Sequence, residues 1–531
     1  MRNFLRVFVI FFLIVDWGFG QPVQSPFQAS LPLPDLVDNT PPGSPTLSLT
    51  TIASNLDVPW DIAWGPDNWL WYAEQGGTIS KVNPATGERK LILRIFPDVF
   101  RYRTRGLLCM ALHPDMERFP FVVVNYHFMK DQEVWSRWAR YTYDGETLTK
   151  PVTLLEVPSK AGHNGSRAAI SPDGEIMMAI GDEDSRNDAA NSGVAQNMDM
   201  VGGKILRLNS DGSIPDDNPF PGSPVWALGF RVPQGLVHAA NGKLYSAEHG
   251  HVTNDEVNLV RKGANYGYPN VSGVCDQPHE IDFCATHAVA GPLMAWTPTI
   301  APSGMDYYNH NAIPEWKNAL LLVTLKTQSL RVLKLNDSGS AIVKEETYFE
   351  KRFGRLRDVC VSPEGDVYIA TSNLDWNPVE GFPTDKDDRI IRISASKSGK
   401  PAAGAPDVVR KASSSSSLKL KTAENGSMLY GNYCASCHKA DGTGLPGTFP
   451  ALKGSPNIIG NKQNLIRIVL QGLAGPSTVG REKYDMEMPA FHFLSDQDVA
   501  DVAAYVRSAF GESQETITAD DVSRIRGERK R

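Results

Sequence analysis

The chain has 531 residues, of which 41% are hydrophobic and 21% are charged, and its formal net charge at pH 7 is -7. This composition is typical of globular protein, and the length is too great for a single hydrophobic core, so two or more domains are expected. The negative charge argues against nucleic acid as a partner, because binding its phosphates requires a basic face.

Residues 1–20 have the layout of a secretory signal peptide. Two arginines precede an apolar run from Val7 to Val15, and small residues follow at Gly18 and Gly20. The run is too short to span a bilayer, although a short membrane anchor is the alternative interpretation. No later stretch approaches the roughly 18 apolar residues of a spanning helix. The expected location is periplasmic or secreted, with no integral membrane segment after signal cleavage.

Residues 21–49 are rich in proline and are expected to be extended, and residues 50–394 contain an internal repeat. Each copy reads as a strand, a tight turn with Pro-Asp, Asn-Gly or Pro-Glu-Gly, and a second strand. Six copies, spaced by roughly fifty to seventy residues, predict an all-β six-bladed β-propeller. A pair of β-sandwiches is the alternative, but it does not explain the recurring turn. The copies begin near Trp60, Gly106, Ser166, Gln234, Pro302 and Arg357.

Polar residues stand close to the starts of several copies, where the inner strands of a propeller meet at its axis. They include four cations and several imidazoles, and so many basic groups around one axis need an anion. These residues are His163, Arg231, His249, His251, Lys326, Arg355 and Arg357. An anionic ligand is therefore expected in the central pocket.

The most specific part of this region is Arg231-Val-Pro-Gln-Gly-Leu, together with residues 246–259 and 262–273. With these stretches, residues 50–394 resemble the soluble glucose dehydrogenase and sorbosone dehydrogenase family over nearly their whole length. The resemblance implies a six-bladed propeller that binds pyrroloquinoline quinone (PQQ) with calcium. It also implies oxidation of an aldose-type sugar, or a related alcohol or aldehyde, by hydride transfer to PQQ.

The resemblance extends to individual residues. His163 matches the general base, and Arg231 matches its partner beside the reacting quinone carbonyl. The residues that match contacts of the PQQ cofactor are Arg231, His249, Lys326, Arg355 and Arg357. The implied calcium ligands are the carbonyl oxygens of Gly250 and His251 under PQQ, and the Glu256 carboxylate with the Tyr266 carbonyl at a second, structural ion.

These residue types suit the implied chemistry. A lysine and two arginines match the charge of a tricarboxylate such as PQQ, and calcium takes carbonyl and carboxylate oxygens. A histidine, with an ordinary pKa of about 6.5, suits proton removal from a sugar hydroxyl. Three positions depart from the family, since Gly162 replaces an aspartate, Val232 an asparagine and Thr104 a glutamine. They touch base or substrate, so the sugar is left open, and Glu183 is either a further substrate contact or a surface turn residue.

Four of the six cysteines lie in the repeat region. Cys275 and Cys284 stand in a loop-like segment and can form a disulfide in an oxidising compartment. Cys109 and Cys360 stand in apolar runs and are expected to be buried thiols.

Residues 395–420 form a predicted linker, because they are rich in serine and lysine and too polar to bury a core. Residues 421–512 contain Cys434-Ala-Ser-Cys437-His438, the spacing of a c-type haem attachment site. The two thiols are expected to bind covalent haem c, and His438 is expected to ligate its iron. A zinc half-site or a CxxC redox pair is the alternative interpretation.

The second iron ligand is expected at Met488, in the run Met488-Pro489-Ala490-Phe491, because cytochromes c use a thioether there. Met486 is the competing candidate. Helical periodicity follows Ser495, so this part resembles a small all-α class I cytochrome c domain. Gly431 and Tyr505 stand where that family packs its first and last helices together.

Residues 513–531, acidic and then basic, are expected to form a solvated, charged tail. Two functions follow for the whole chain. The first is a quinohaemoprotein oxidoreductase that takes electrons from a small sugar substrate and passes them through haem to a periplasmic electron acceptor. The alternative is a propeller without PQQ that binds a ligand or partner and is attached to an electron-carrying cytochrome c.

Overall fold

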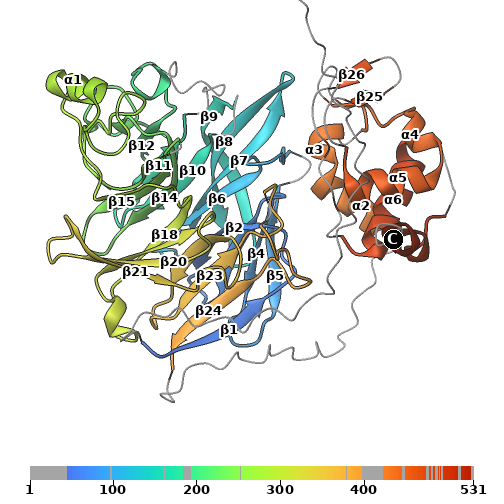
Figure 1. The fold of residues 1–531 in the computed structure, drawn as a ribbon, viewed down its shortest axis with the longest axis horizontal. Coiled ribbons are helices and arrows are strands. Elements are labelled where there is room, and N and C mark those ends of the chain that lie inside the picture. The colour runs from blue at the N-terminus through green and yellow to red at the C-terminus, as the bar shows by residue number, and fades with distance from the viewer. Residues whose placement is uncertain are drawn as a thin grey trace, which may run out of the picture. The chain divides into compact units, whose positions relative to one another are not determined.

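The computed structural model shows a strand-rich part followed by a small helical part (Figure 1). The described residues are 45–95, 98–159, 163–182, 193–251, 253–377, 379–396, 422–439, 441–444, 449–473, 477–479, 482–484, 488, 491, 494–511 and 516–527. The predicted signal peptide and most of the predicted linker lie outside them. Within the described residues, no helix combines the length and the apolar character needed to cross a membrane.

Six four-stranded antiparallel sheets form a β-propeller, which confirms the fold predicted for this region. Blade 1 consists of β2 (Pro59–Trp64), β3 (Leu70–Glu74), β4 (Thr78–Val82) and β5 (Arg89–Arg94). Blade 2 consists of β6 (Leu107–Leu112), β7 (Phe121–Lys130), β8 (Glu133–Tyr143) and β9 (Leu148–Pro158). Blade 3 consists of β10 (Gly165–Ile170), β11 (Ile176–Ile180), β12 (Lys204–Leu208) and β13 (Val225–Leu228). Blade 4 consists of β14 (Val232–His238), β15 (Leu244–His249), β16 (Asp255–Val260) and β17 (Met294–Trp296). Blade 5 consists of β18 (Pro302–Tyr308), β19 (Ala319–Thr324), β20 (Leu330–Leu335) and β21 (Ile342–Tyr348). Blade 6 consists of β22 (Leu356–Val361), β23 (Val367–Thr371), β24 (Ile390–Ala395) and β1 (Leu47–Ala53).

The ring is closed by β1, which comes first in the chain and is the outer strand of the last blade. It pairs antiparallel with β24, and Leu47 lies opposite Ala395. Backbone hydrogen bonds of one sheet therefore join the two ends of the propeller.

The repeated phrases of the sequence form the inner strand of each blade and the hairpin that follows it. In blade 3 the hairpin turn is closed by a hydrogen bond of 2.9 Å from the amide of Gly174 to the carbonyl of Ser171. Gly174 has a φ of +87°, a backbone conformation that glycine adopts without strain. Blade filling by tryptophan is also observed, since Trp60 and Trp71 are 2% and 0% exposed.

Three inner strands carry an aspartate whose carboxylate accepts a hydrogen bond from the backbone of the next blade. The bonds tie neighbouring inner strands together around the axis, where their own edges cannot pair as in a sheet. The pairs, measured from carboxylate oxygen to amide nitrogen, are Asp61 with Met110 (2.9 Å), Asp306 with Val361 (2.8 Å) and Asp358 with Ile62 (2.7 Å).

Arg167, on inner strand β10, lies between two of these carboxylates. Its Nη1 is 2.6 Å from Asp61 and 3.3 Å from Asp358, and each of the three side chains is at most 7% exposed. Replacing Arg167 with methionine leaves two buried carboxylates without their cation, so we expect the propeller to lose about 3 kcal/mol of stability. Thermal unfolding followed by far-UV circular dichroism measures this loss. The exposed Arg118→Met is the control, and an unchanged midpoint for Arg167→Met would contradict the expectation.

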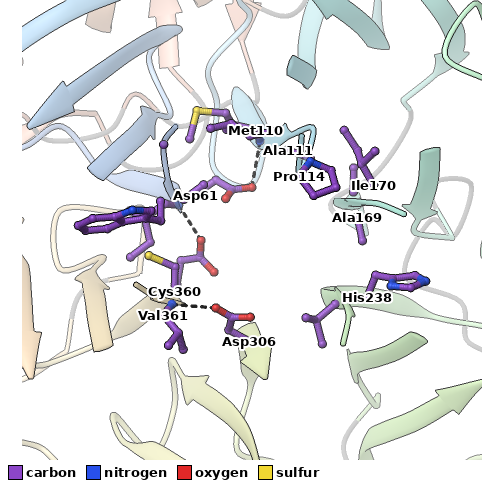
Figure 2. Close-up of a pocket in the computed structure, with 18 of the residues that line it drawn as sticks. Asp61, Met110, Ala111, Pro114, Ala169, Ile170, His238, Asp306, Cys360 and Val361 are labelled. Atoms are coloured by element: carbon purple, nitrogen blue, oxygen red, sulfur yellow. Dashed lines mark hydrogen bonds between the residues drawn. The ribbon is translucent and has the colours of Figure 1, made fainter. Parts of the chain in front are cut away.

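A cavity of about 520 Å³ lies on the axis, at the end where the inner strands finish (Figure 2). All six blades line it, through residues that include Asp61, Met110, Ala169, His238, Asp306 and Cys360. None of the predicted site residues lines this cavity. His163, Arg231 and Arg355 lie just before the inner strands β10, β14 and β22, at the other end of the axis, so this cavity is separate from them.

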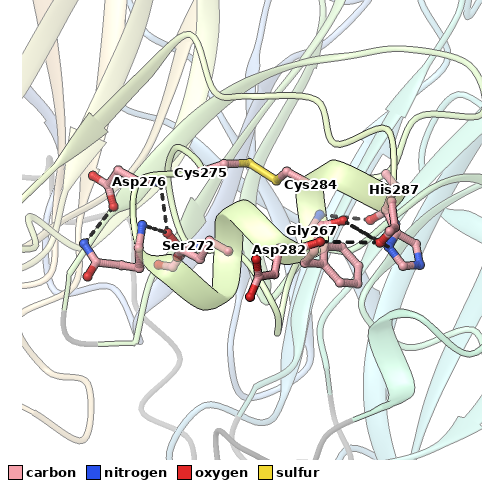
Figure 3. The surroundings of a disulfide bond; sticks show 12 residues. Gly267, Ser272, Cys275, Asp276, Asp282, Cys284 and His287 are labelled. Atoms are coloured by element: carbon pink, nitrogen blue, oxygen red, sulfur yellow. Dashed lines mark hydrogen bonds between the residues drawn. A yellow bond between two sulfur atoms is a disulfide. The ribbon is translucent and has the colours of Figure 1, made fainter.

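An insertion between β16 and β17 carries helix α1 (Pro278–Thr286) and the disulfide Cys275–Cys284, which confirms that predicted pairing (Figure 3). The carboxylate of Glu280 accepts hydrogen bonds from the backbone amides of Ser272 (3.0 Å) and Gln277 (3.0 Å). The disulfide and this carboxylate hold the insertion together. The predicted burial of the two other propeller thiols is also confirmed, because Cys109 and Cys360 are 0% and 6% exposed.

The helical part contains a compact apolar core. Its elements are α2 (Thr422–Tyr433), α3 (Ala435–His438), α4 (Pro456–Ile459), α5 (Lys462–Gln471), β25 (Ser477–Val479), β26 (Glu482–Tyr484), α6 (Asp496–Phe510) and α7 (Ala519–Gly527). The predicted start of α6 is observed, since the hydroxyl of Ser495 accepts a hydrogen bond of 3.1 Å from the amide of Asp498.

The expectation of a solvated tail is wrong for residues 519–527. They form α7, which packs against α5 and α6 with Val522 and Ile525 at 0% and 2% exposed. Two of its charges pair with the rest of the domain, through Asp521 with Lys462 (2.9 Å) and Arg526 with Asp496 (2.8 Å). The charged residues that suggested a solvated segment thus flank a short apolar face, formed by Val522 and Ile525.

Helices α2 and α6 are in close contact at Gly426. A Cβ placed there would lie 2.3 Å from the carbonyl oxygen of Asp501 and 2.8 Å from the Cβ of Tyr505, so only glycine fits. Tyr505 lies at this contact as predicted, and the surroundings of Gly431, the glycine predicted there, lie outside the described residues.

Candidate active site and haem site

His163 and Arg231 meet at the end of the axis where the inner strands begin. His163 lies just before β10, Arg231 lies just before β14, and Nη2 of Arg231 is 3.0 Å from Nε2 of His163. A guanidinium only donates, so Nε2 of His163 accepts and carries no proton. Burial, with the nearby charges of Arg231, His249 and His251, lowers the pKa of His163 to about 4. The imidazole is therefore neutral at pH 7, as a general base must be.

Arg231 is held at both its backbone and its side chain. Its amide donates to Oε2 of the buried Glu248 at 2.6 Å, and Nη1 donates to the carbonyl of Gly250 at 2.8 Å. Nη2 is also 3.3 Å from Nδ1 of His251. Its Nε is buried and has no hydrogen-bond partner among the described residues. The arginine thus joins the loop after β15 to His163 and keeps one donor available.

Asp255 organises the segments that carry the next predicted residues. Its carboxylate accepts hydrogen bonds from the amides of Gly250 (2.8 Å) and Ile300 (2.6 Å). The amide of Lys326 donates to the carbonyl of Ile300, and its Nζ donates to the hydroxyl of Thr299 at 2.6 Å. Lys326 is exposed, so its charge faces solvent at the edge of the site.

His249 connects this cluster to blade 5. Its Nε2 is 2.8 Å from the carbonyl of Pro302, and it is buried enough to lower its pKa to about 4. The charges of Arg231 and Arg357 also lower the pKa of His249. The structure therefore brings the predicted basic residues together around one end of the axis.

Arg355 and Arg357 share one internal anion, a feature that the sequence did not reveal. The carboxylate of Asp375, whose side chain is 0% exposed, lies 2.8 Å from Nη2 of Arg355 and 2.9 Å from Nη2 of Arg357. Arg357 also stacks on Trp60, with its guanidinium carbon 3.8 Å from the ring centre. The protein itself therefore supplies one of the anions that the predicted cluster of cations needs, although two cations still face this one carboxylate.

Glu256 belongs to a group of oxygen-bearing side chains on one face of β15 and β16. It lies opposite Glu248, and Ser246 lies opposite Asn258. Burial raises the pKa of Glu256 to about 7, and the amide oxygen Oδ1 of Asn258 is buried without a hydrogen-bond partner in the described structure. Among the described residues, no group of three or more His, Cys, Asp or Glu side chains is arranged to hold a metal. Tyr266 is buried nearby in the fold's core, stacked on Phe230.

In the helical part, His438 is oriented for a role as an iron ligand. Its Nδ1 lies 2.8 Å from the carbonyl of Pro450, which leaves Nε2 for iron. Burial lowers the pKa of His438 and so favours the neutral imidazole that binds a metal. Cys434 is half-buried immediately before α3. The side chain of Cys437 lies outside the described residues.

Met488 is fixed by a two-way backbone pair with Leu473, with both N to O distances at 3.0 Å. Its side chain packs against the apolar core of the helical part. Met486, the competing candidate, lies outside the described residues, so Met488 stays the predicted second ligand.

The positions that depart from the family are structural where they are described. The carbonyl of Thr104 accepts a hydrogen bond of 2.7 Å from Asn164, the residue after His163, and Val232 is buried in β14. Gly162 and Glu183 lie outside the described residues. The residues that sequence reasoning missed are Asp375, Glu248 and Asp255, which act on the predicted cations and loops. In the sequence, the only indication of their roles is that each is an acidic residue close to a predicted functional segment.

Two family models cover the two parts of the chain. Residues 56–377 match the model for glucose/sorbosone dehydrogenase, and residues 423–510 match the model for cytochrome c. The C-terminal part also resembles cytochrome c-552 of Thermus thermophilus, which is 32% identical over 114 residues. This alignment covers 20% of this chain and 86% of that protein.

Relatives of the propeller point to the same family. Quinoprotein glucose dehydrogenase B of Acinetobacter calcoaceticus is 34% identical over 403 residues, covering 60% of this chain and 84% of that protein. The PQQ-bound form of aldose sugar dehydrogenase from Streptomyces coelicolor superimposes with a TM-score of 0.55 at 29% identity, covering 66% of this chain and 99% of that chain. The protein is therefore an oxidoreductase that belongs to the glucose/sorbosone dehydrogenase family and carries a C-terminal cytochrome c domain.

Proposed function

We propose that this protein is a quinohaemoprotein that oxidises an aldose-type sugar and passes the electrons to its own haem c. The observation that carries the proposal is the contact of His163 with Arg231, next to a cluster of cations at one end of the propeller axis. The printed names of the relatives, a quinoprotein and a PQQ-bound enzyme, support PQQ as the cofactor. When bound, PQQ accepts a hydride, and haem c carries electrons to a periplasmic acceptor.

The residues at the axis fit a cofactor with several carboxylates. Arg355 and Arg357 share a single carboxylate, so the pair keeps a positive charge, and Arg357 is 3% exposed. Arg231 adds a buried donor without a partner among the described residues, and Lys326 adds a charge at the edge. Arginine can contact a carboxylate with two parallel hydrogen bonds, which orients a planar ligand as well as binding it.

His163 is the proposed base. Because Arg231 donates a hydrogen bond to Nε2 of His163, this nitrogen carries no proton. It removes the proton of the sugar hydroxyl once the substrate takes the place of the guanidinium. Arg231 remains cationic and stabilises the negative charge that develops beside it. The lowered pKa of His163 weakens it as a base, but it ensures that nearly every molecule holds the neutral form at pH 7.

The whole proposal is tested by adding PQQ, calcium chloride and an aldose to the full-length ferric protein. We expect the haem spectrum to change from ferric to ferrous. A ferric spectrum that persists across a panel of sugars and alcohols would instead favour a ligand-binding propeller attached to a cytochrome.

Calcium is proposed at Glu256 with the Tyr266 carbonyl, and at the Gly250 and His251 carbonyls. A buried carboxylate and the unpaired Oδ1 of Asn258 fit the preference of calcium for oxygen ligands. The Gly250 carbonyl is engaged by Arg231, so an ion there shares this oxygen with the guanidinium or displaces it.

Removal of calcium should destabilise the propeller. A chelator added to protein without PQQ should lower the unfolding free energy by about 2.7 kcal/mol relative to calcium at one hundred times its Kd. Thermal unfolding with and without calcium measures the effect. Glu256→Gln should lose most of this response, while Glu133→Gln, an exposed residue on β8, should retain it. Equal responses in the two variants would exclude Glu256 as a ligand.

A periplasmic or secreted location is part of the proposal. It is supported by the predicted signal peptide and by the disulfide Cys275–Cys284, because disulfides persist in oxidising compartments. The covalent haem motif agrees, since haem is attached in this way outside the bacterial cytoplasm.

A further inference from the structure

Asn164, the residue that follows the proposed base, is 2% exposed and forms hydrogen bonds through both ends of its side-chain amide. Its Nδ2 donates to the carbonyl of Thr104 at 2.7 Å and lies 3.2 Å from the hydroxyl of the same residue. Its Oδ1 accepts a hydrogen bond of 3.3 Å from the hydroxyl of Ser159. Thr104 precedes β6 and Ser159 follows β9, so this one side chain fastens the segments that enter and leave blade 2 to the residue beside the base.

The main chain around His163 is held as closely. The carbonyl of Asn164 accepts hydrogen bonds from the amide of Gly181 at 3.0 Å and from the hydroxyl of Ser166 at 3.1 Å. A Cβ placed on Gly181 would lie 1.9 Å from the carbonyl oxygen of His163, so only glycine allows the residue after β11 to pack there. The base therefore stands on a backbone that is fixed from both blade 2 and blade 3.

The turn after the base is also strained. Gly165 and Ser166 have φ values of +63° and +71°, and the pairing of β10 with β11 shifts between Gly165 and Arg167, which makes Ser166 the extra residue of a β-bulge. Within the six inner strands, all of which are described, no other non-glycine residue has a positive φ. Such a conformation costs free energy in a residue with a side chain, and it persists where the surroundings enforce it. The hydrogen bonds of Asn164 supply part of this enforcement.

We propose that Asn164 is a positioning residue for proton transfer from the sugar hydroxyl to His163. By holding the main chain beside the base, it keeps Nε2 of His163 at 3.0 Å from Nη2 of Arg231. Gly162, on the other side of the base in the sequence, has no side chain that could orient the imidazole. The inference rests on the proposed function and deepens it, because it names a residue that acts through the base and not on the sugar.

The test uses the full-length protein loaded with PQQ, calcium and haem, and the fastest aldose of a panel of glucose, galactose, xylose and arabinose. Asn164→Ala should lower kcat/KM about tenfold, because a displaced base is less often in line with the hydroxyl, and should leave the Kd for PQQ within about twofold. The pH at which kcat/KM falls in acid should rise by about one unit, since a looser imidazole is better solvated and its pKa is less depressed.

Two further variants complete the comparison. Asn218→Ala is the matched control, because Asn218 is also buried and also donates to main-chain carbonyls, those of Arg207 (3.2 Å) and Ser223 (2.9 Å), but lies between β12 and β13 in the outer part of blade 3. It should lose thermal stability yet keep the kcat/KM and the pH profile of the parent. Ser159→Ala removes only the hydrogen bond to Oδ1 and should lower kcat/KM about threefold, so it decides the question if Asn164→Ala does not fold.

The positioning role is overturned by an unchanged kcat/KM in folded Asn164→Ala, or by an equal loss in Asn218→Ala, which would attribute the effect to stability alone. A tenfold loss with an unmoved acid limb would also overturn it, because Asn164 would then act on something other than the base. Failure of the proposed function gives a different result. In that case the parent oxidises no sugar of the panel, or His163→Ala is as fast as the parent, and both are seen before the Asn164 variants are compared.

Discussion

Replacing His163 with alanine should slow sugar oxidation by about a hundredfold to ten-thousandfold, the usual contribution of a general base. The neutral imidazole, fixed by Arg231 at 3.0 Å, is the proposed proton acceptor, and alanine leaves none in its place. Haem reduction in single-turnover mixing of sugar with the fully loaded protein measures the rate. PQQ affinity should change much less, because the carboxylates of PQQ are assigned to other residues.

The pH dependence gives a second readout of His163. Since its pKa is lowered to about 4, protonation should abolish kcat/KM only well below pH 6.5, the ordinary value for histidine. His238→Ala is the matched control, because His238 lines the cavity at the other end of the axis and should leave the rate unchanged. A His163→Ala protein that reduces its haem as fast as the parent would remove His163 from the mechanism.

Replacing both Cys434 and Cys437 with serine should abolish covalent haem while leaving sugar oxidation intact. Thioether bonds to the haem require both thiols, and serine cannot form them. We expect no haem to remain on the denatured chain and no reduction of a periplasmic-type acceptor protein. Reduction of a small soluble dye by sugar should stay within about twofold of the parent, because residues 47–395 alone supply every strand of the six sheets.

This pair of assays separates the two halves of the proposed reaction. Ser436→Ala, between the two cysteines in the sequence, is the control and should keep the haem. Loss of dye reduction in the double cysteine variant would mean that oxidation itself depends on haem. Retention of haem would show that the motif does not attach it.

The propeller was predictable because each inner strand repeats one short pattern. The copies at Trp60 and Arg357 become β2 and β22, which begin and end the ring of inner strands, and the recurring turns become hairpins. The positions of His163 and Arg231 near the axis were predictable for the same reason, since both stand just before such strands, whereas their proposed roles come from the family resemblance. Their direct contact required the fold, because it joins loops of different blades.

Asp375 could not be assigned from the sequence. It lies in the segment after β23, outside the repeated pattern, and its role depends on two arginines that precede it by 20 and 18 residues. A lone aspartate beside an exposed tryptophan reads as a surface turn. Only the three-dimensional structure shows that its side chain is fully buried between the two cations.

Helix α7 was misjudged for a related reason. Its apolar face consists of Val522 and Ile525, too short a pattern to stand out among the charges around it. The partners that neutralise those charges, Lys462 and Asp496, come from earlier helices. Charge patterning along a chain therefore shows solvation only where no distant partner is available.

The pairing of β1 with β24 has a consequence for how such a chain can be assembled. Because Leu47 lies opposite Ala395, the propeller begins and finishes at adjacent points of one sheet. An extra module appended there leaves every blade undisturbed, so gene fusion is an undemanding route to an enzyme with a built-in electron carrier. By the same geometry, a circular permutant with the old ends spliced and new ones opened in an outer hairpin should still assemble the complete ring.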